Sequence, residues 1–160
     1  MGLARVFVPL LLFVFGLYAV APAAEAPTRT DYVVQLERIC KPRTEATRRA
    51  VRGVQEDVRS EHLSRAAPKV ARAKRIFAKT VSLIGGVPRP EADLAKLARW
   101  FSALHRESKA LEATVDALRD DNIPRFQRVW ADFIHQANKA NNVVVAFGFN
   151  YCSFKSSRFR

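Results

Sequence analysis

Residues 90–118 read PEADLAKLARWFSALHRESKALEATVDAL and carry the clearest structural signal in the chain. A spacing of three and four places apolar side chains on one face of an α-helix. Only Ser108 interrupts a seven-residue repeat of the kind that packs one helix against others. This stretch therefore predicts a helix that buries one stripe in a bundle. The stripe consists of Leu94, Leu97, Phe101, Leu104, Leu111, Val115 and Leu118.

The segment that follows repeats this pattern. Asn122 and Pro124 form a helix start signal, and Gly148 is a typical stop. Asn141 interrupts the apolar face, and we expect it to fix the register of the helix or, alternatively, to hydrogen-bond a ligand inside the bundle. The apolar face consists of Phe126, Val129, Trp130, Phe133, Ile134, Ala137, Val144 and Val145.

Two more helices are predicted upstream. In the first, which runs to about Val58, Thr30 or Asp31 is the expected cap, and Pro42 marks a kink or a break. The second opens at Pro68 and ends before residues 85–90, a Gly- and Pro-rich loop that cannot be helical. Four helices with short connections predict an all-α fold, an antiparallel four-helix bundle.

The N-terminus has the composition of a secretory signal peptide. Residues 6–20 (VFVPLLLFVFGLYAV) are apolar, and Ala21-Pro22-Ala23 matches the small-residue pattern at which signal peptidase cleaves. We expect residues 1–23 to be removed and the protein to be secreted, periplasmic or attached to the cell envelope. The alternative is a membrane anchor over residues 3–24, which are nearly free of charge. The bundle is predicted over residues 24–152, followed by a flexible basic tail over residues 153–160.

The two cysteines, Cys40 and Cys152, are predicted to form one disulfide. An exported chain meets an oxidising compartment, and neither cysteine has a second Cys or a His at metal-ligand spacing. In an antiparallel bundle the last helix ends beside the start of the first. Four extended residues after Gly148 span about 13 Å, which is enough to reach Cys40. The alternative is two unpaired thiols.

The ends of the predicted bundle also carry a recognisable pattern. It combines the pair Asp31-Tyr32, the cysteine in the first helix and the ending Phe147-Gly148-Phe149-Asn150-Tyr151-Cys152. Together with the signal peptide, these features resemble a group of small, secreted, uncharacterised bacterial proteins of helical-bundle form. The specific part of the resemblance is the Gly-Phe-x-x-Cys ending. It supports the disulfide, and no activity, ligand or site follows from it.

The positive charge of the chain is unevenly distributed. The formal net charge is +12, and residues 38–79 hold thirteen Lys and Arg against four Asp and Glu, whereas residues 80–121 hold six against seven. This asymmetry predicts one strongly positive face. We expect that face to bind an anionic surface or polymer of the cell envelope, a membrane included if the signal peptide is retained. The residues assigned to it are Arg48, Arg49, Arg52, Arg72 and Arg75.

The sequence favours a non-catalytic protein without a cofactor or a metal. It contains no Gly-rich phosphate loop, no nucleophile elbow and no C-x-x-C-H motif, and its three histidines are far apart. Sequence-specific nucleic-acid binding is not favoured, because no helix-turn-helix, zinc motif or interleaved aromatic pattern is present. The oligomeric state is not indicated.

Two alternative functions follow from the predicted core. The first is a carrier of a small apolar ligand held between the helices, with Phe77, Phe101, Trp130 and Phe133 as candidate lining residues. The second is a hydrolase whose site matches no motif. A high salt concentration should weaken binding to an anionic surface and spare an apolar ligand.

Overall fold

The structure is a computed structural model that describes residues 26–159. The predicted signal peptide (residues 1–23) and the alternative anchor (residues 3–24) lie outside the described residues. Within residues 26–159, no helix is both long enough and apolar enough to cross a membrane.

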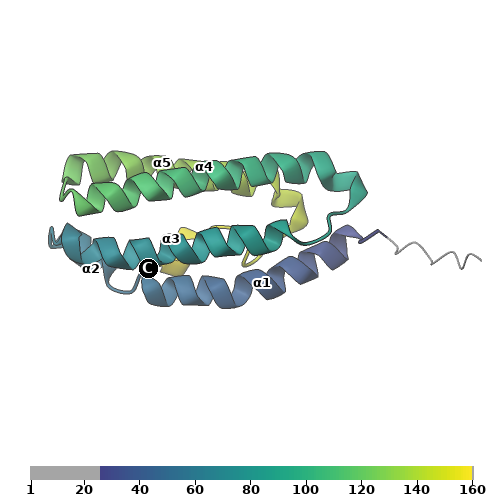
Figure 1. Cartoon of the computed structure of the whole chain (residues 1–160), viewed down its shortest axis with the longest axis horizontal. Helices are drawn as coiled ribbons and strands as arrows, with labels where there is room; N and C mark the ends of the chain where they lie inside the picture. Colours follow the sequence, from purple (N-terminus) through teal and green to yellow (C-terminus); the bar gives the residue numbers. More distant parts are fainter. Residues whose placement is uncertain (1–25, 160) are drawn as a thin grey trace, which may run out of the picture.

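All the regular secondary structure of the described residues is helical (Figure 1). The four long helices are α1, α3, α4 and α5, which confirms the predicted all-α four-helix bundle; residues 26–159 contain no strand. α3 packs against α1 and α4, and α4 packs against α5, whereas α1 and α5 make little direct contact. The elements are α1 (Arg29–Ala50), α2 (Val54–Arg59), α3 (Leu63–Gly85), η1 (Glu91–Asp93), α4 (Leu94–Arg119), α5 (Ile123–Val143), η2 (Val145–Phe147) and η3 (Ser156–Phe159).

The first predicted helix breaks at its C-terminal end and not at Pro42. Pro42 lies inside α1 and leaves the carbonyl of Arg38 without its helical partner. Both residues are exposed, so water can satisfy that carbonyl. The chain leaves the helix at Val51, and Gly53 takes a left-handed conformation (φ 77°) that glycine adopts with little strain. The short α2 then continues in a new direction.

Two predicted helix starts are also corrected. α1 is capped by Thr28, whose side chain accepts from the backbone N–H of Asp31 in a reciprocal capping box, so Asp31 is the third residue of the helix and not its cap. α3 begins at Leu63, five residues before Pro68, because Leu63, Ala66 and Ala67 are buried. Only the predicted start of α5 is confirmed, with the Asn122 side chain accepting from the Arg125 N–H at 2.8 Å.

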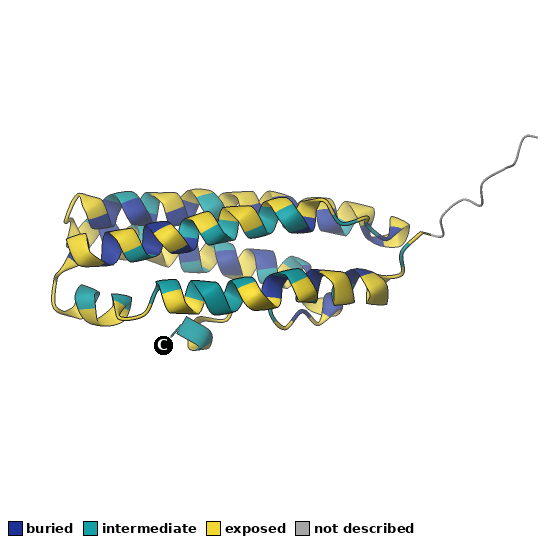
Figure 2. Ribbon diagram, turned by 60° about the horizontal axis from the view of Figure 1, so that its bottom comes forward, coloured by how far each residue is buried: buried dark blue, intermediate teal, exposed yellow. Residues whose placement is uncertain are grey.

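Buried residues recur along the helices of the bundle (Figure 2), and their side chains form two clusters. The first contains the cysteine of α1 and is called here the disulfide-end cluster; the second is called the alanine-rich cluster. The disulfide-end cluster consists of Tyr32, Leu36, Cys40, Ile84, Leu97, Trp100, Phe101, Ala103, Leu104, Ala140, Val144, Phe147 and Phe149. The alanine-rich cluster consists of Leu63, Ala66, Ala67, Val70, Ala71, Ala110, Leu111, Val115, Ala117, Leu118, Phe126 and Phe133.

The chain after α5 crosses from that helix to α1. Gly148 is left-handed (φ 66°), and the following residues run back along α1 to the Cys40–Cys152 disulfide, whose Cα atoms lie 5.2 Å apart. The Glu37 carboxylate accepts from the backbone N–H groups of Asn150, Tyr151 and Cys152 at 2.9–3.1 Å. The predicted disulfide is therefore confirmed, and it indicates an oxidising compartment outside the cytoplasm.

Residues 153–159, part of the predicted flexible tail, lie against α5. The side-chain amide of Asn141 donates to the Phe154 carbonyl at 2.7 Å and accepts from the Phe154 N–H at 3.0 Å. The ring of Phe154 meets that of Phe133 edge-on at 5.3 Å. Asn141, the polar residue predicted to interrupt the apolar face, thus binds the backbone of the chain itself. Phe154 satisfies both the N–H and the oxygen of its side-chain amide.

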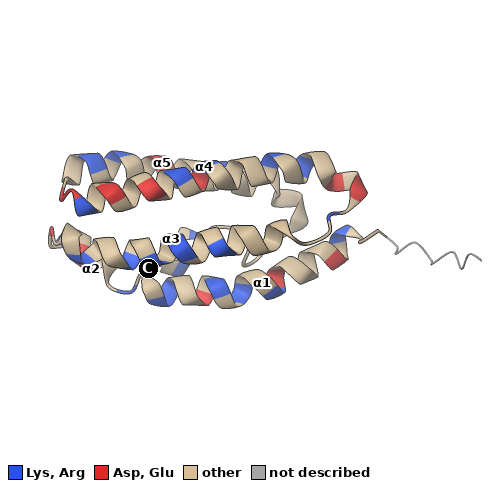
Figure 3. Cartoon of the chain, in the orientation of Figure 1, with Lys and Arg blue, Asp and Glu red and all other residues tan. Residues whose placement is uncertain are grey.

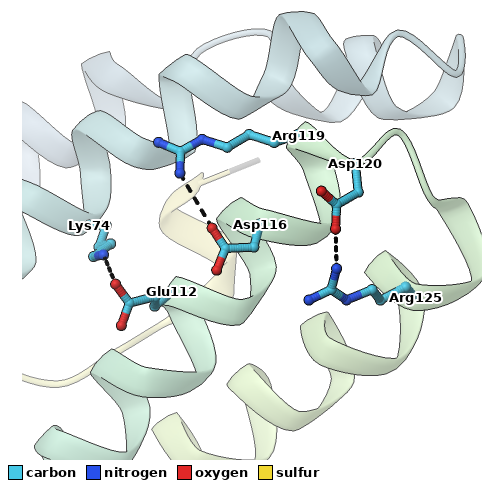
Figure 4. A network of polar contacts seen from close by, with 6 residues as sticks. All are labelled: Lys74, Glu112, Asp116, Arg119, Asp120 and Arg125. Carbon is cyan, nitrogen blue, oxygen red and sulfur yellow. Dashed lines mark hydrogen bonds and ion pairs between the residues drawn. The ribbon is translucent and has the colours of Figure 1, made fainter.

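Charged side chains link neighbouring helices at both ends of the bundle. Arg29 donates two hydrogen bonds of 2.7 Å to Asp93, and this contact holds the pKa of the buried Asp93 carboxyl below its usual value. At the other end, Lys74 of α3 pairs with Glu112 of α4, and Arg125 of α5 pairs with Asp120 at the end of α4 (Figure 4). A third pair, Asp116 with Arg119, lies within α4.

Candidate functional site

An apolar groove runs along the side of the bundle where α1 and α5 do not meet. Its volume is about 580 Å³, which falls in the range of small-molecule pockets. α1 and α2 form one wall, α5 forms the other, and α3 and α4 form the floor. Residues 151–159 cross between the walls, from Cys152, which is bonded to Cys40 of α1, to Phe154 against α5. The lining residues that α3 and α4 contribute are Val70, Ala73, Phe77, Thr80, Val81, Ile84, Trp100, Leu104, Glu107, Leu111 and Thr114.

Aromatic side chains line the α5 wall. Trp130 is 39% exposed although it is large and apolar, and its ring lies 6.3 Å from that of Phe126 and 5.1 Å from that of Phe133. The three rings form a continuous aromatic surface facing Phe77 and the α2 residue Val58 across the groove. An apolar molecule placed here would cover an exposed tryptophan, which is a favourable change.

Three of the four lining residues expected from sequence are brought together. Phe77, Trp130 and Phe133 line the groove, whereas Phe101 does not. Phe101 is buried in the disulfide-end cluster with the Arg89 guanidinium 4.4 Å from its ring centre. The reason is helical phase: Trp100 takes the groove-facing position on α4, and the next residue points about 100° away.

Glu107 is the functional candidate that the apolar pattern of residues 90–118 did not reveal. It is only 4% exposed, lines the floor of the groove and lies on α4 between the two core clusters. Its side chain makes no hydrogen bond or ion pair with any of residues 26–159, and burial alone raises its pKa to about 8. The signal was present in the spacing, because Glu107 follows Leu104 by three residues and precedes Leu111 by four.

No family model, curated protein or solved structure matches the chain. The resemblance to small secreted bundle proteins therefore stays a prediction. The site has to be interpreted from its own chemistry.

The five arginines of the predicted positive face are all exposed. Arg48 and Arg49 end α1, Arg52 lies in the turn before α2, and Arg72 and Arg75 lie on α3. None of them forms an ion pair within residues 26–159. Lys and Arg residues recur along both α1 and α3 (Figure 3), and these two helices pack against each other.

The described residues contain no cluster of side chains that could hold a metal ion. His62, His105 and His135 are exposed on three different segments of the fold.

The two tryptophans differ in their surroundings. Trp100 is 1% exposed and stacked on Phe149 at 5.3 Å, whereas Trp130 borders solvent. The apolar lining of the groove suits the binding of an apolar ligand.

Proposed function

We propose that the protein is a non-catalytic carrier, secreted or held in the periplasm or cell envelope, that binds an elongated molecule with an apolar body. The observation that carries the proposal is the 580 Å³ groove, which crosses both core clusters and exposes Trp130. Native proteins seldom leave large aromatic surfaces in contact with water unless something binds there.

The charged residues of the groove favour a ligand with an acidic end. Arg43 on α1 and Arg59 on α2 are the charged lining residues besides Glu107, and the net charge of the chain is +12. Arg59 shares its charge with Glu56 at 3.0 Å, whereas Arg43 forms no ion pair within residues 26–159. Hexadecanoate, an apolar chain with one carboxylate, is therefore a suitable probe.

The test blocks the groove from the α1 wall. Thr47→Trp places a large side chain at a half-buried lining position, and Gln35→Trp places the same side chain at an exposed position of α1 outside the groove. Calorimetric titration of the delipidated protein with hexadecanoate should show saturable binding for the wild type and Gln35→Trp, and weakened binding for Thr47→Trp. Absence of saturable binding to the wild type, or equal affinity in all three proteins, would overturn the proposal.

A second function is favoured by the unpaired arginines. We propose that Arg48, Arg49, Arg52, Arg72 and Arg75 bind an anionic surface of the envelope, on which the carrier would release or collect its ligand. Binding to vesicles that contain phosphatidylglycerol should fall steeply with salt and be lost when all five become Gln.

A charge-matched control variant distinguishes the effect of these five arginines from the effect of the net charge of the protein. Replacing Lys96, Arg99, Arg106, Lys109 and Arg128 by Gln removes the same charge from α4 and α5. That variant should keep most of the vesicle binding. Equal loss in both variants would show that net charge alone acts and would contradict a localised face.

A further inference from the structure

The groove has a long floor with Glu107 halfway along it. The α4 residues that line it recur every three or four positions, from Trp100 through Leu104, Glu107 and Leu111 to Thr114. At 1.5 Å per residue, this stripe is about 21 Å long, and Glu107 lies about 10 Å from either end. A molecule that fills the floor therefore places the middle of its body at this carboxyl.

Glu107 also differs from the other buried polar groups of the described residues. The charged or polar side chains that are buried are Asp93, Glu107 and Thr114, and the buried Tyr32 also carries a hydroxyl. Asp93 is paired with Arg29, and the Thr114 hydroxyl donates to the Ala110 carbonyl at 2.9 Å. Glu107 has no partner among residues 26–159, and unlike the unpartnered Tyr32 hydroxyl, which is enclosed in the disulfide-end cluster, it lines the groove. Its hydrogen-bonding capacity faces the groove.

Several other polar side chains that line the groove are already occupied. The Thr80 hydroxyl donates to the Ile76 carbonyl at 2.7 Å, and the Thr44 hydroxyl donates to the Tyr151 carbonyl at 3.1 Å. The Asn141 amide is held by Phe154. The hydroxyls of Thr47 and Tyr151 make no hydrogen bond within residues 26–159, but they belong to α1 and to the segment beside the disulfide. On the floor, Glu107 is therefore the carboxyl or hydroxyl group left to pair with a polar group of a ligand.

The charge state of the carboxyl indicates which polar group fits. The charged or titratable lining residues besides Glu107 are Arg43 on α1, Arg59 on α2 and Tyr151 beside the disulfide, while α3 and α5 contribute none. No cation lies close enough to lower the pKa of Glu107, so the protonated form dominates at pH 7. A protonated carboxyl donates a hydrogen bond, which an uncharged oxygen accepts.

We propose that Glu107 recognises a hydroxyl or carbonyl oxygen in the middle of the ligand, and that the carrier prefers oxygenated apolar chains to plain ones. This inference rests on the proposed carrier function. It assigns the ligand an acidic end that reaches Arg43 on the α1 wall and an uncharged oxygen in the part of its body that lies against Glu107 on the floor.

The experiment compares two probes on three proteins. Calorimetry at pH 6.5 measures the affinity of hexadecanoate and of hexadecanoate hydroxylated in mid-chain for the wild type, Glu107→Leu and Glu112→Gln. Glu112 is an exposed α4 residue outside the groove. The wild type and Glu112→Gln should bind the hydroxylated probe about tenfold more tightly, as one well-placed hydrogen bond provides. Glu107→Leu should bind the two probes with equal affinity.

The outcomes separate the inference from the function on which it rests. Equal affinity of the wild type for the two probes, or an unchanged preference in Glu107→Leu, overturns the role of Glu107 and leaves the carrier function standing. Tighter binding of hexadecylamine than of either acid also overturns it, since Glu107 would then act as an anion. Absence of any binding refutes the carrier function itself. If Glu107→Leu does not fold, Glu107→Met serves instead, because it keeps the length of the side chain without a hydrogen-bond donor, and it should lose the preference.

Discussion

The disulfide-end cluster holds five aromatic side chains among thirteen buried residues, whereas the alanine-rich cluster holds two among twelve, together with five alanines. At the disulfide end, Phe147 and Phe149 come from beyond α5 and stack at 5.4 Å, and Phe149 also stacks on Trp100. At the other end, small side chains on α3 and α4 let these helices approach closely. No comparable large residue covers Trp130, which stays partly exposed.

This difference shows how one bundle can be closed at one end and open along its side. Large aromatic residues and a covalent link fill the disulfide end. The alanine-rich end stabilises the α3–α4 contact and leaves the α2 and α5 walls apart. Glu107 lies where the two clusters meet, and the groove crosses both.

Removal of the disulfide should have the largest effect on stability. The bond joins residues 112 apart, and closing a loop of about one hundred residues contributes about 4.7 kcal/mol in the chain-entropy description. Cys40→Ala with Cys152→Ala should lower the free energy of unfolding by up to that amount in urea denaturation. Hydrogen exchange should accelerate at Phe149 and Tyr151 more than in the alanine-rich cluster. Uniform acceleration would show that the two clusters do not differ in this respect.

The buried carboxyl at the junction should make stability depend on pH. The folded pKa of Glu107 is about 8, above its ordinary 4.5, so unfolding releases a proton between these values. The contribution of the protonated Glu107 carboxyl to the free energy of unfolding is fully present below pH 4.5. It is lost as pH rises toward 8, by at most about 1.4 kcal/mol per pH unit.

Glu107→Gln is the matching variant for this dependence. Its urea midpoint should fall less between pH 5 and pH 8 than that of the wild type, because the amide does not titrate. Identical pH profiles for the two proteins would show that Glu107 is not buried as the structure describes.

Replacing an alanine by leucine should destabilise the protein more in the packed core than at the groove. Ala66 is fully buried in the alanine-rich cluster, so Ala66→Leu should cost about 1–3 kcal/mol through overpacking. Ala73 is 5% exposed but lines the groove, so Ala73→Leu has room to extend into it and should cost less than Ala66→Leu. Thermal unfolding of both variants measures the difference. A larger loss for Ala73→Leu would contradict the groove.

The smallest effect is expected at Tyr32 in the disulfide-end cluster. Tyr32 is fully buried, its hydroxyl has no hydrogen-bond partner among residues 26–159, and burial raises its pKa to about 12. Tyr32→Phe removes this unsatisfied group and should stabilise the protein by about 1 kcal/mol, measured by urea denaturation. Destabilisation would indicate a partner for the hydroxyl, such as a bound water.

The helical content and the disulfide followed from residue order alone. Apolar residues spaced three and four apart place the stripes of α3, α4 and α5, and the count and position of two cysteines predict their pairing. The Asn122 cap is equally local, since its side chain reaches an N–H only three residues away. These features depend on neighbours along the chain, which a sequence displays directly.

Two features depend on tertiary packing: the position at which the first predicted helix breaks, and the groove. Pro42 stays helical because it faces water, and Phe101 misses the groove because Trp100 occupies the position that faces it. The spacing of Glu107 from Leu104 and Leu111 puts it on the apolar face of α4, but the depth of its burial is decided by the helices that pack against that face. Periodicity indicates which residues share a face of one helix, whereas the environment of that face is created by the other helices.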